Sequence, residues 1–337
     1  MKTRVDIDRT EHLDYTRIHE KRMASERVPG RMNTMNRKWV CGMLMVLLFA
    51  LAAGLAAADT VSFGDVTVDT DAVYVDMGDM KIEDWKGYYA FLDQLPKLEK
   101  VDMFGTEVKK PKIEEMAERY PNIEFGWTMR IVEHTIRTDQ TAFSTLHGDP
   151  SDPVHSENDF SILKYCKNLM ALDVGHNIIR DVSFLYDLPK LRVLILACNC
   201  ITDITPVGSL KDLEYLEIFW NQIGDISPLT GLTHLMDLDI VNNYIKDLTP
   251  LHEMKQLKRL WTHHFNMKGM MRPWEPIEAL RAALPDTHID NDSTSTAGGW
   301  RKHPHYDVIY RMFRTTVYEP FEDSYPFESE AEPAPQP

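Results

Sequence analysis

The sequence predicts an α/β solenoid, in which short repeats stack so that their strands form one curved parallel sheet on the inner face, with turns or short helices outside. Three features predict this fold. Asparagines recur every 22 residues, apolar residues keep fixed offsets from each asparagine, and acids and prolines recur on the return side of the repeat. The asparagines are Asn177, Asn199, Asn221 and Asn243.

Seven apolar columns run through the four copies. Three columns precede the asparagine in a short strand, and four follow it. One copy cannot bury its apolar side alone, so stacked copies must share a continuous core. The columns are Leu169/Leu191/Leu213/Leu235, Leu172/Leu194/Leu216/Leu238, Val174/Leu196/Ile218/Ile240, Ile179/Ile201/Ile223/Ile245, Val182/Ile204/Ile226/Leu248, Leu185/Val207/Leu229/Leu251 and Leu188/Leu210/Leu232/Met254.

Polar residues at fixed positions predict the turns. An asparagine amide can bond the backbone in the turn that leaves the strand, where polar groups would otherwise be buried without partners. The acids are expected to serve the outer turns, and the prolines favour extended or tight-turn segments over a full helix. Phe184 replaces the proline in the first copy, so a different outer segment is expected there. The acids are Asp181, Asp203, Asp225 and Asp247, and the prolines are Pro206, Pro228 and Pro250.

Together the columns read L-x-x-L-x-L-x-x-N-x-I-x-D-I. This pattern resembles the leucine-rich repeat family and, within it, the bacterial 22-residue, internalin-like subtype. The resemblance implies irregular caps at the N- and C-terminal ends of the solenoid. It also implies a non-enzymatic binding protein of a bacterial envelope or secreted fraction, although a fold alone does not establish a function.

A leader precedes the repeats. The segment Trp39–Ala58 carries no charge and follows two basic residues. Residues 37–58 are therefore predicted to be a signal peptide or, as the alternative, an uncleaved transmembrane anchor. Both alternatives export the repeats, because positive charge stays inside, so we expect an extracytoplasmic protein, secreted or at the bacterial cell surface. Residues 1–36 are a polar extension that suits neither; translation from Met35 instead of Met1, or a short cytoplasmic tail, would account for them.

The rest of the chain is strongly acidic. Residues 1–58 hold 10 of the 37 Lys and Arg and 6 of the 52 Asp and Glu, which leaves 27 basic against 46 acidic residues and a net charge of −19. This balance argues against nucleic acid or an anionic membrane as the partner, because both require a basic face. It favours a neutral or cationic ligand.

The segments around the repeats are less regular. The stretch before them contains strand and helix patterns and is predicted to be irregular repeats that begin the same solenoid, with a separate small α/β domain as the alternative. Helices are predicted at 277–284 and 306–317 in the C-terminal cap. The predicted segments are 59–132 (N-terminal repeats or cap), 133–158 (loop), 159–267 (regular repeats), 268–318 (C-terminal helical cap) and 319–337 (disordered acidic, proline-rich tail).

Alternate strand residues on the inner sheet are predicted to face solvent, while the leucines face the core. Toward the C-terminal half these positions combine aromatic rings with carboxylates, as binding surfaces for a protein, a peptide or a cell-wall glycan do. The alternative is that the rings pack on one another or under the C-terminal cap. The candidate ligand-binding residues are Tyr215, Glu217, Phe219, Trp220, Asp237, Asp239 and Trp261.

The sequence gives little support for catalysis. Glu217 and Asp239 are one repeat apart, so their α-carbons are expected roughly 5 Å apart on neighbouring strands. This acidic pair is the basis of the alternative function, an envelope hydrolase, but rows of acids on a sheet are far more often recognition surfaces. The histidine pairs His263–His264 and His303/His305 lack partners at a metal-binding spacing, so neither a metal nor a cofactor is predicted.

Overall fold

The computed structural model describes residues 59–131, 133–146, 154–263, 276–293 and 299–322, and these residues belong to two compact units. The leader at 37–58 and the extension at 1–36 lie outside the described residues. Within the described ranges, no helix has the length and apolar character needed to cross a membrane.

The first unit comprises described residues up to 75 together with 84–98. It contains the antiparallel pair β1 (Thr60–Phe63) and β2 (Val66–Asp69) and helix α2 (Trp85–Leu92). Asp84 caps α2, because its side chain accepts a hydrogen bond from the Gly87 N–H. The ring of Phe63 packs on those of Tyr88 and Phe91, so the hairpin and the helix share a small aromatic core.

A four-stranded sheet has the order β3-β4-β5-β6. Strands β4 and β5 are parallel and are connected through α3, whereas β5 and β6 form an antiparallel pair. Strands β3, β4 and β5 lie in the segment 59–132, which the sequence predicts to be irregular repeats that begin the solenoid. They pair with one another and with β6, in a sheet separate from the seven-stranded one described next. The elements are β3 (Tyr74–Asp76), β4 (Lys100–Val108), α3 (Lys110–Arg119), β5 (Glu124–Ile131) and β6 (His134–Arg137).

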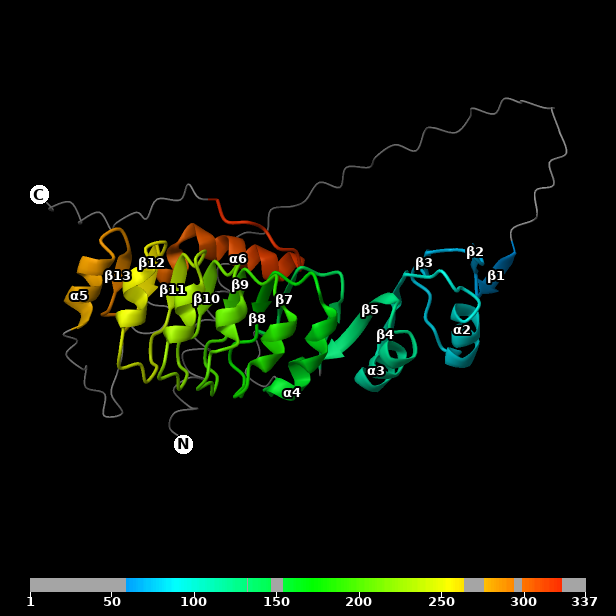
Figure 1. The fold of residues 1–337 in the computed structure, drawn as a ribbon, viewed down its shortest axis with the longest axis horizontal. Helices are drawn as coiled ribbons and strands as arrows, with labels where there is room; N and C mark the ends of the chain where they lie inside the picture. The colour runs from blue at the N-terminus through cyan, green and yellow to red at the C-terminus, as the bar shows by residue number, and fades with distance from the viewer. Residues whose placement is uncertain (1–58, 132, 147–153, 264–275, 294–298, 323–337) are drawn as a thin grey trace, which may run out of the picture. The chain divides into compact units, whose positions relative to one another are not determined.

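The repeats form a seven-stranded sheet in the order β13-β12-β11-β10-β9-β8-β7, and every neighbouring pair is parallel (Figure 1). The predicted α/β solenoid is therefore confirmed. Strands β6 and β7 lie inside 133–158, so the prediction that this whole segment is a loop is wrong. The strands are β7 (Ala142–Ser144), β8 (Ala171–Asp173), β9 (Val193–Ile195), β10 (Tyr215–Glu217), β11 (Asp237–Asp239), β12 (Arg259–Trp261) and β13 (His288–Asp290).

Short 3-10 helices line the outer side of the solenoid. Asp225 illustrates the predicted turn, because its Oδ1 accepts the Ser227 N–H at 2.8 Å, and the other three acids bond the same position. Phe184 lies in an equivalent 3-10 helix, so the first copy does not differ as expected. The outer elements are α4 (Glu157–Phe160), η1 (Ser161–Tyr165), η2 (Ser183–Asp187), η3 (Val207–Ser209), η4 (Ser227–Gly231) and η5 (Thr249–Glu253).

The asparagines form a buried ladder between the repeats. Asn221 Nδ2 donates to the carbonyls of Ile218 at 3.1 Å and of Leu196, one strand earlier, at 3.0 Å. Its Oδ1 accepts the N–H of Ile201 in the preceding repeat at 3.0 Å. Asn199 and Asn243 repeat this pattern. The predicted role of the asparagine is confirmed, and each amide bonds the backbone of two repeats.

The residue before each asparagine turns the chain out of the strand in the left-handed region. These residues have φ between 52° and 58°, which is uncommon for side chains larger than glycine. The asparagine ladder accounts for these positive φ values, because the hydrogen bonds of each asparagine fix the backbone at this turn. The four residues are His176, Cys198, Trp220 and Asn242.

The C-terminal segment contains α5 (Pro276–Ala283), η6 (Trp300–Lys302) and α6 (Pro304–Thr315). The helices α5 and α6 lie where the sequence predicts helices. Figure 1 shows α6 running across the strands of the repeat sheet. The chain after α6 bonds the first strand of that sheet, since the N–H groups of Thr141 and Ala142 donate to the Thr316 carbonyl.

Candidate functional site: the covered inner face

The inner face carries the predicted ligand-binding residues, but these residues do not face solvent. Six of them are 3% exposed or less and Trp220 is partly buried. The expectation of an open surface is therefore wrong in this structure. The buried residues are Tyr215, Glu217, Phe219, Asp237, Asp239 and Trp261.

The cause is the C-terminal segment. One side of α6 is apolar, and Val308, Ile309 and Met312 from this side are buried together with Trp300 of η6 against the inner face. We call η6 and α6 the cover of the inner face. The solenoid thus has a second core, between the sheet and this cover, in addition to the core that the leucine columns form. The rings of Tyr215 and Trp261 lie 5.4 and 5.0 Å from that of Trp300. The rings therefore pack under the C-terminal cap, as the alternative prediction for these residues states.

Polar groups of the sheet bind the cover at specific atoms. Glu217 Oε1 accepts the Trp300 Nε1–H at 2.8 Å and also the hydroxyl of Tyr215. Arg259 donates to the Trp300 carbonyl at 3.0 Å, and its guanidinium lies 4.3 Å from the centre of the Trp300 ring. Trp300 is therefore held by hydrogen bonds, a cation–π contact and aromatic packing at once.

Asp237 is the centre of a buried ion cluster. Its two oxygens lie 2.8 Å from Arg259 Nε and 2.5 Å from His305 Nδ1. Burial alone would raise the pKa of Asp237, but the charge of Arg259 and the hydrogen bonds from His305 and Arg259 outweigh burial and lower this pKa to about 2. The cluster therefore joins the sheet to α6 through a charged carboxylate.

Two other acids on the same face, Asp173 and Asp239, have pKa values above the usual value for an aspartate. Burial raises the pKa of Asp173 to about 7, although the Gly175 N–H bonds one of its oxygens. Burial, together with the nearby Glu217, also raises the pKa of Asp239 well above its usual value. Neither acid has a basic partner like the one that Asp237 has in Arg259. Desolvation therefore dominates at both positions.

Asp173→Asn should stabilise the protein at pH 8, by about 2–4 kcal/mol. The folded state keeps the proton of this acid to a higher pH than the unfolded state does. Its contribution to stability therefore falls as pH rises from about 4 to about 7. Urea titrations between pH 4 and 8 measure the effect. Asp187→Asn, at an exposed acid, is the control and should leave the profile unchanged; equal profiles for both variants would contradict the prediction.

The acidic pair of the hydrolase alternative is enclosed. Glu217 is engaged by Tyr215 and Trp300, and Asp239 accepts the Val241 N–H at 3.0 Å beneath the cover. The two side chains are on paired positions of β10 and β11, as predicted. A substrate would have to displace the C-terminal segment to reach them.

The histidines singled out in the sequence have structural contacts. His263 Nδ1 lies 2.8 Å from the Asn291 carbonyl, and His305 binds Asp237. His303 Nδ1 accepts the backbone N–H of His305. His264 lies outside the described residues. The structure instead brings Glu133, His134 and His155 together, a cluster that the sequence analysis missed.

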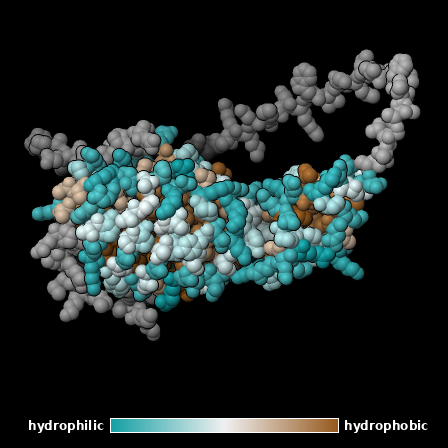
Figure 2. Space-filling view, in the orientation of Figure 1, coloured by the Kyte–Doolittle hydropathy of each residue, from teal (hydrophilic) through white to brown (hydrophobic). Residues whose placement is uncertain are grey.

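Figure 2 shows one face of the molecule, on which the repeats present mainly hydrophilic side chains and the hydrophobic colour is confined to small areas. Few large apolar side chains of the repeats are exposed. A further cluster of buried apolar side chains lies on the inner face, where α6 covers it.

A comparison with family models matches a model of two leucine-rich repeat copies to residues 189–231. Among solved structures, internalin C2 of Listeria monocytogenes is 21% identical, with 69% of this chain and 80% of that chain covered and a TM-score of 0.32. Internalin F of the same organism is 21% identical, with 66% and 70% covered and a TM-score of 0.31. A leucine-rich repeat protein of Leptospira interrogans is 18% identical, with 60% and 56% covered and a TM-score of 0.31. No curated protein matches the chain.

Proposed function

We propose that the chain is a non-enzymatic leucine-rich repeat binding protein whose inner sheet recognises polypeptide; the match of residues 189–231 to a model of two leucine-rich repeats supports this. One observation carries the proposal: the inner face binds a polypeptide segment, its own C-terminal one, through directional polar contacts as well as apolar packing. Among a protein, a peptide and a glycan, this observation favours polypeptide.

The contacts with the C-terminal segment resemble those of an interface hot spot. A buried tryptophan, an arginine and a paired acid dominate such sites, and surrounding residues exclude water. Trp300, Arg259 and Asp237 are this set here, and each is 1% exposed or less. We therefore assign the predicted ligand-binding residues to recognition of a helical segment, which is α6 in this structure.

The proposed place of action is outside the cytoplasm. The uncharged segment Trp39–Ala58 supports export, as a signal peptide or an anchor. The acidic charge of the remaining chain suits a soluble exported protein whose ligand is neutral or basic. A partner with a basic, amphipathic helix fits this charge and the contacts that Glu217 and Asp237 make with the segment.

Binding in trans tests the proposal. A chain that ends at residue 293 should bind a labelled synthetic peptide of residues 299–322, measured by fluorescence anisotropy. Trp300→Ala in the peptide should weaken binding at least tenfold, or about 1.4 kcal/mol, because it removes the buried ring and its hydrogen bond to Glu217.

Arg314→Ala in the peptide is the control, since Arg314 is exposed and its guanidinium lies over the ring of Tyr310 in the same helix. It should bind like the unaltered peptide. A shortened chain that folds by circular dichroism yet does not bind the peptide would contradict the proposal. A shortened chain that does not fold would make the segment an inseparable part of the core and would contradict it as well.

A further inference from the structure

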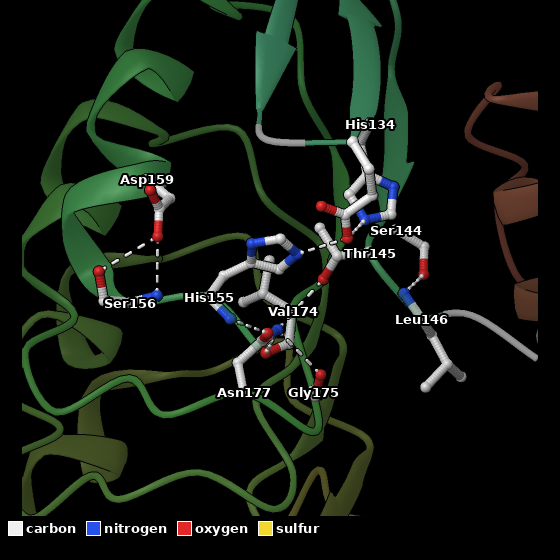
Figure 3. A network of polar contacts seen from close by, with 11 residues as sticks. His134, Ser144, Thr145, Leu146, His155, Ser156, Asp159, Val174, Gly175 and Asn177 are labelled. Carbon is white, nitrogen blue, oxygen red and sulfur yellow. Dashed lines mark hydrogen bonds and ion pairs between the residues drawn. The ribbon is translucent and has the colours of Figure 1, made fainter. Parts of the chain in front are cut away.

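Three potential metal ligands, Glu133, His134 and His155, lie together beside the segment before α4, which is the first turn of the solenoid. Glu133 Oε1 lies 3.0 Å from His134 Nε2 and 3.0 Å from His155 Nε2, and one ligand atom of each residue lies within 4.8 Å of the others. Figure 3 shows the His134 ring, which comes from β6, and the His155 ring, which comes from the chain before α4, turned toward the same place. Glu133 lies in the turn between β5 and β6.

His155 stands where the repeat otherwise uses isoleucine. Its backbone N–H donates to Asn177 Oδ1 at 2.8 Å, just as the N–H of Ile179 donates to Asn199 Oδ1 at 3.0 Å. Its carbonyl accepts from Ile178 in the way that the Ile179 carbonyl accepts from Cys200. Ile179, Ile201 and Ile223 are fully buried at this position, and His155 is 2% exposed. The equivalent positions of three other copies thus carry a buried apolar side chain, whereas position 155 carries a buried imidazole.

The surroundings are suited to holding a cation. His155 packs edge-on to Phe160 at 5.9 Å, and His134 packs edge-on to Phe143 at 6.2 Å, so apolar rings flank the two imidazoles. Glu133 Oε2 is buried and makes no hydrogen bond to any described residue.

We propose that Glu133, His134 and His155 bind a divalent transition-metal ion, for which Zn²⁺ is the best fit. Two histidines and one carboxylate are a recurrent set for zinc, and the fourth position is left for water or an added ligand. Zinc bonds of about 2.0–2.2 Å in a tetrahedral site place ligand atoms roughly 3.3 Å apart, close to the 3.0 Å that separates Glu133 Oε1 from each of the two imidazole Nε2 atoms.

The ion would join two parts of the same compact unit. Glu133 lies in the β5–β6 turn of the four-stranded sheet and His134 begins β6. His155 lies in the segment before α4, where Asn177 Oδ1 accepts its backbone N–H. The site does not depend on the proposed binding at the inner face, because none of its residues touches α6 or η6 among the contacts described above.

Metal analysis of the full, untagged chain tests the proposal. After dialysis against Zn²⁺ and then buffer, the protein should hold one zinc per chain, and Co²⁺ in its place should give the visible absorption of a tetrahedral site. Saturating Zn²⁺ should raise the melting temperature by several degrees, because the ion binds the folded state.

His155→Ile is the decisive variant, because it restores the isoleucine of the other repeats. It should fold at least as well as the parent chain and lose the bound zinc, the cobalt spectrum and the zinc-dependent rise in melting temperature. Glu133→Gln should weaken zinc binding at least tenfold, and His234→Ala, at an exposed histidine, should change nothing. A parent chain that holds no zinc, or a His155→Ile chain that holds as much as the parent, would overturn the proposal and leave a hydrogen-bonded triad.

Discussion

Asn221→Ala should lower the free energy of unfolding by about 3–4 kcal/mol. The substitution removes the acceptor of the Ile201 N–H and the donor to the carbonyls of Leu196, Ile218 and Phe219, all in the buried ladder. The methyl group of alanine replaces none of these bonds, and water does not reach a position that is 1% exposed. Because one amide serves two repeats, the loss reaches both of them. Urea denaturation followed by circular dichroism measures the effect.

Asn168→Ala is the matched control for this substitution. Asn168 is exposed and accepts one hydrogen bond, from Lys190. Its replacement should change stability by about 0.5 kcal/mol or less, since water can take the place of the lysine. If Asn221→Ala cost no more than Asn168→Ala, the ladder would contribute little to holding the repeats together.

Asp237→Ala should destabilise the protein by about 3–5 kcal/mol near neutral pH. It leaves Arg259, which is 1% exposed, without the carboxylate that neutralises it, and it removes the partner of His305. We expect η6 and α6 to pack less tightly on the sheet as a result. The fluorescence of Trp300 should then be quenched more readily by a solute in water, in addition to the loss of stability. Thermal and urea denaturation measure the first effect, and quenching by iodide measures the second.

The same variant should change the acid sensitivity of the protein. The pKa of Asp237 in the folded state is about 2, below its unfolded value of about 3.9. Its contribution to stability is therefore present above about pH 4 and is lost as pH falls to about 2, so the parent and Asp237→Ala curves should converge in that range. Asp139→Ala is the control, because its pair with Arg137 is exposed and should contribute about 1 kcal/mol or less. Equal losses for Asp237→Ala and Asp139→Ala would contradict the importance of the buried cluster.

The sequence by itself determined the repeat and its register. Each leucine, isoleucine and asparagine of a repeat contacts equivalent residues one repeat away. The 22-residue period is therefore enough to predict where the strands, the asparagine ladder and the outer turns lie. It also placed Glu217 beside Asp239 on neighbouring strands. The 22-residue pattern is weaker at the ends of the solenoid. Strand β7 has Phe143 where the repeats have leucine, and more residues separate it from the next strand, so the pattern does not predict a strand there.

Only the tertiary structure decided which face of the sheet meets water. The strand period separates the two faces but does not say what covers the second one, and α6 lies about 70 residues from the acids it covers in β11. The amphipathic helix, Trp300 and the acceptor groups of Glu217 and Asp237 are each compatible with a solvated surface when read alone. Trp300 bonds Glu217, and His305 of α6 bonds Asp237, across a long distance in sequence. Because of these contacts, the face that was predicted to be open is buried. The same holds for His155, whose meeting with Glu133 and His134 depends on how the first turn of the solenoid packs on β6.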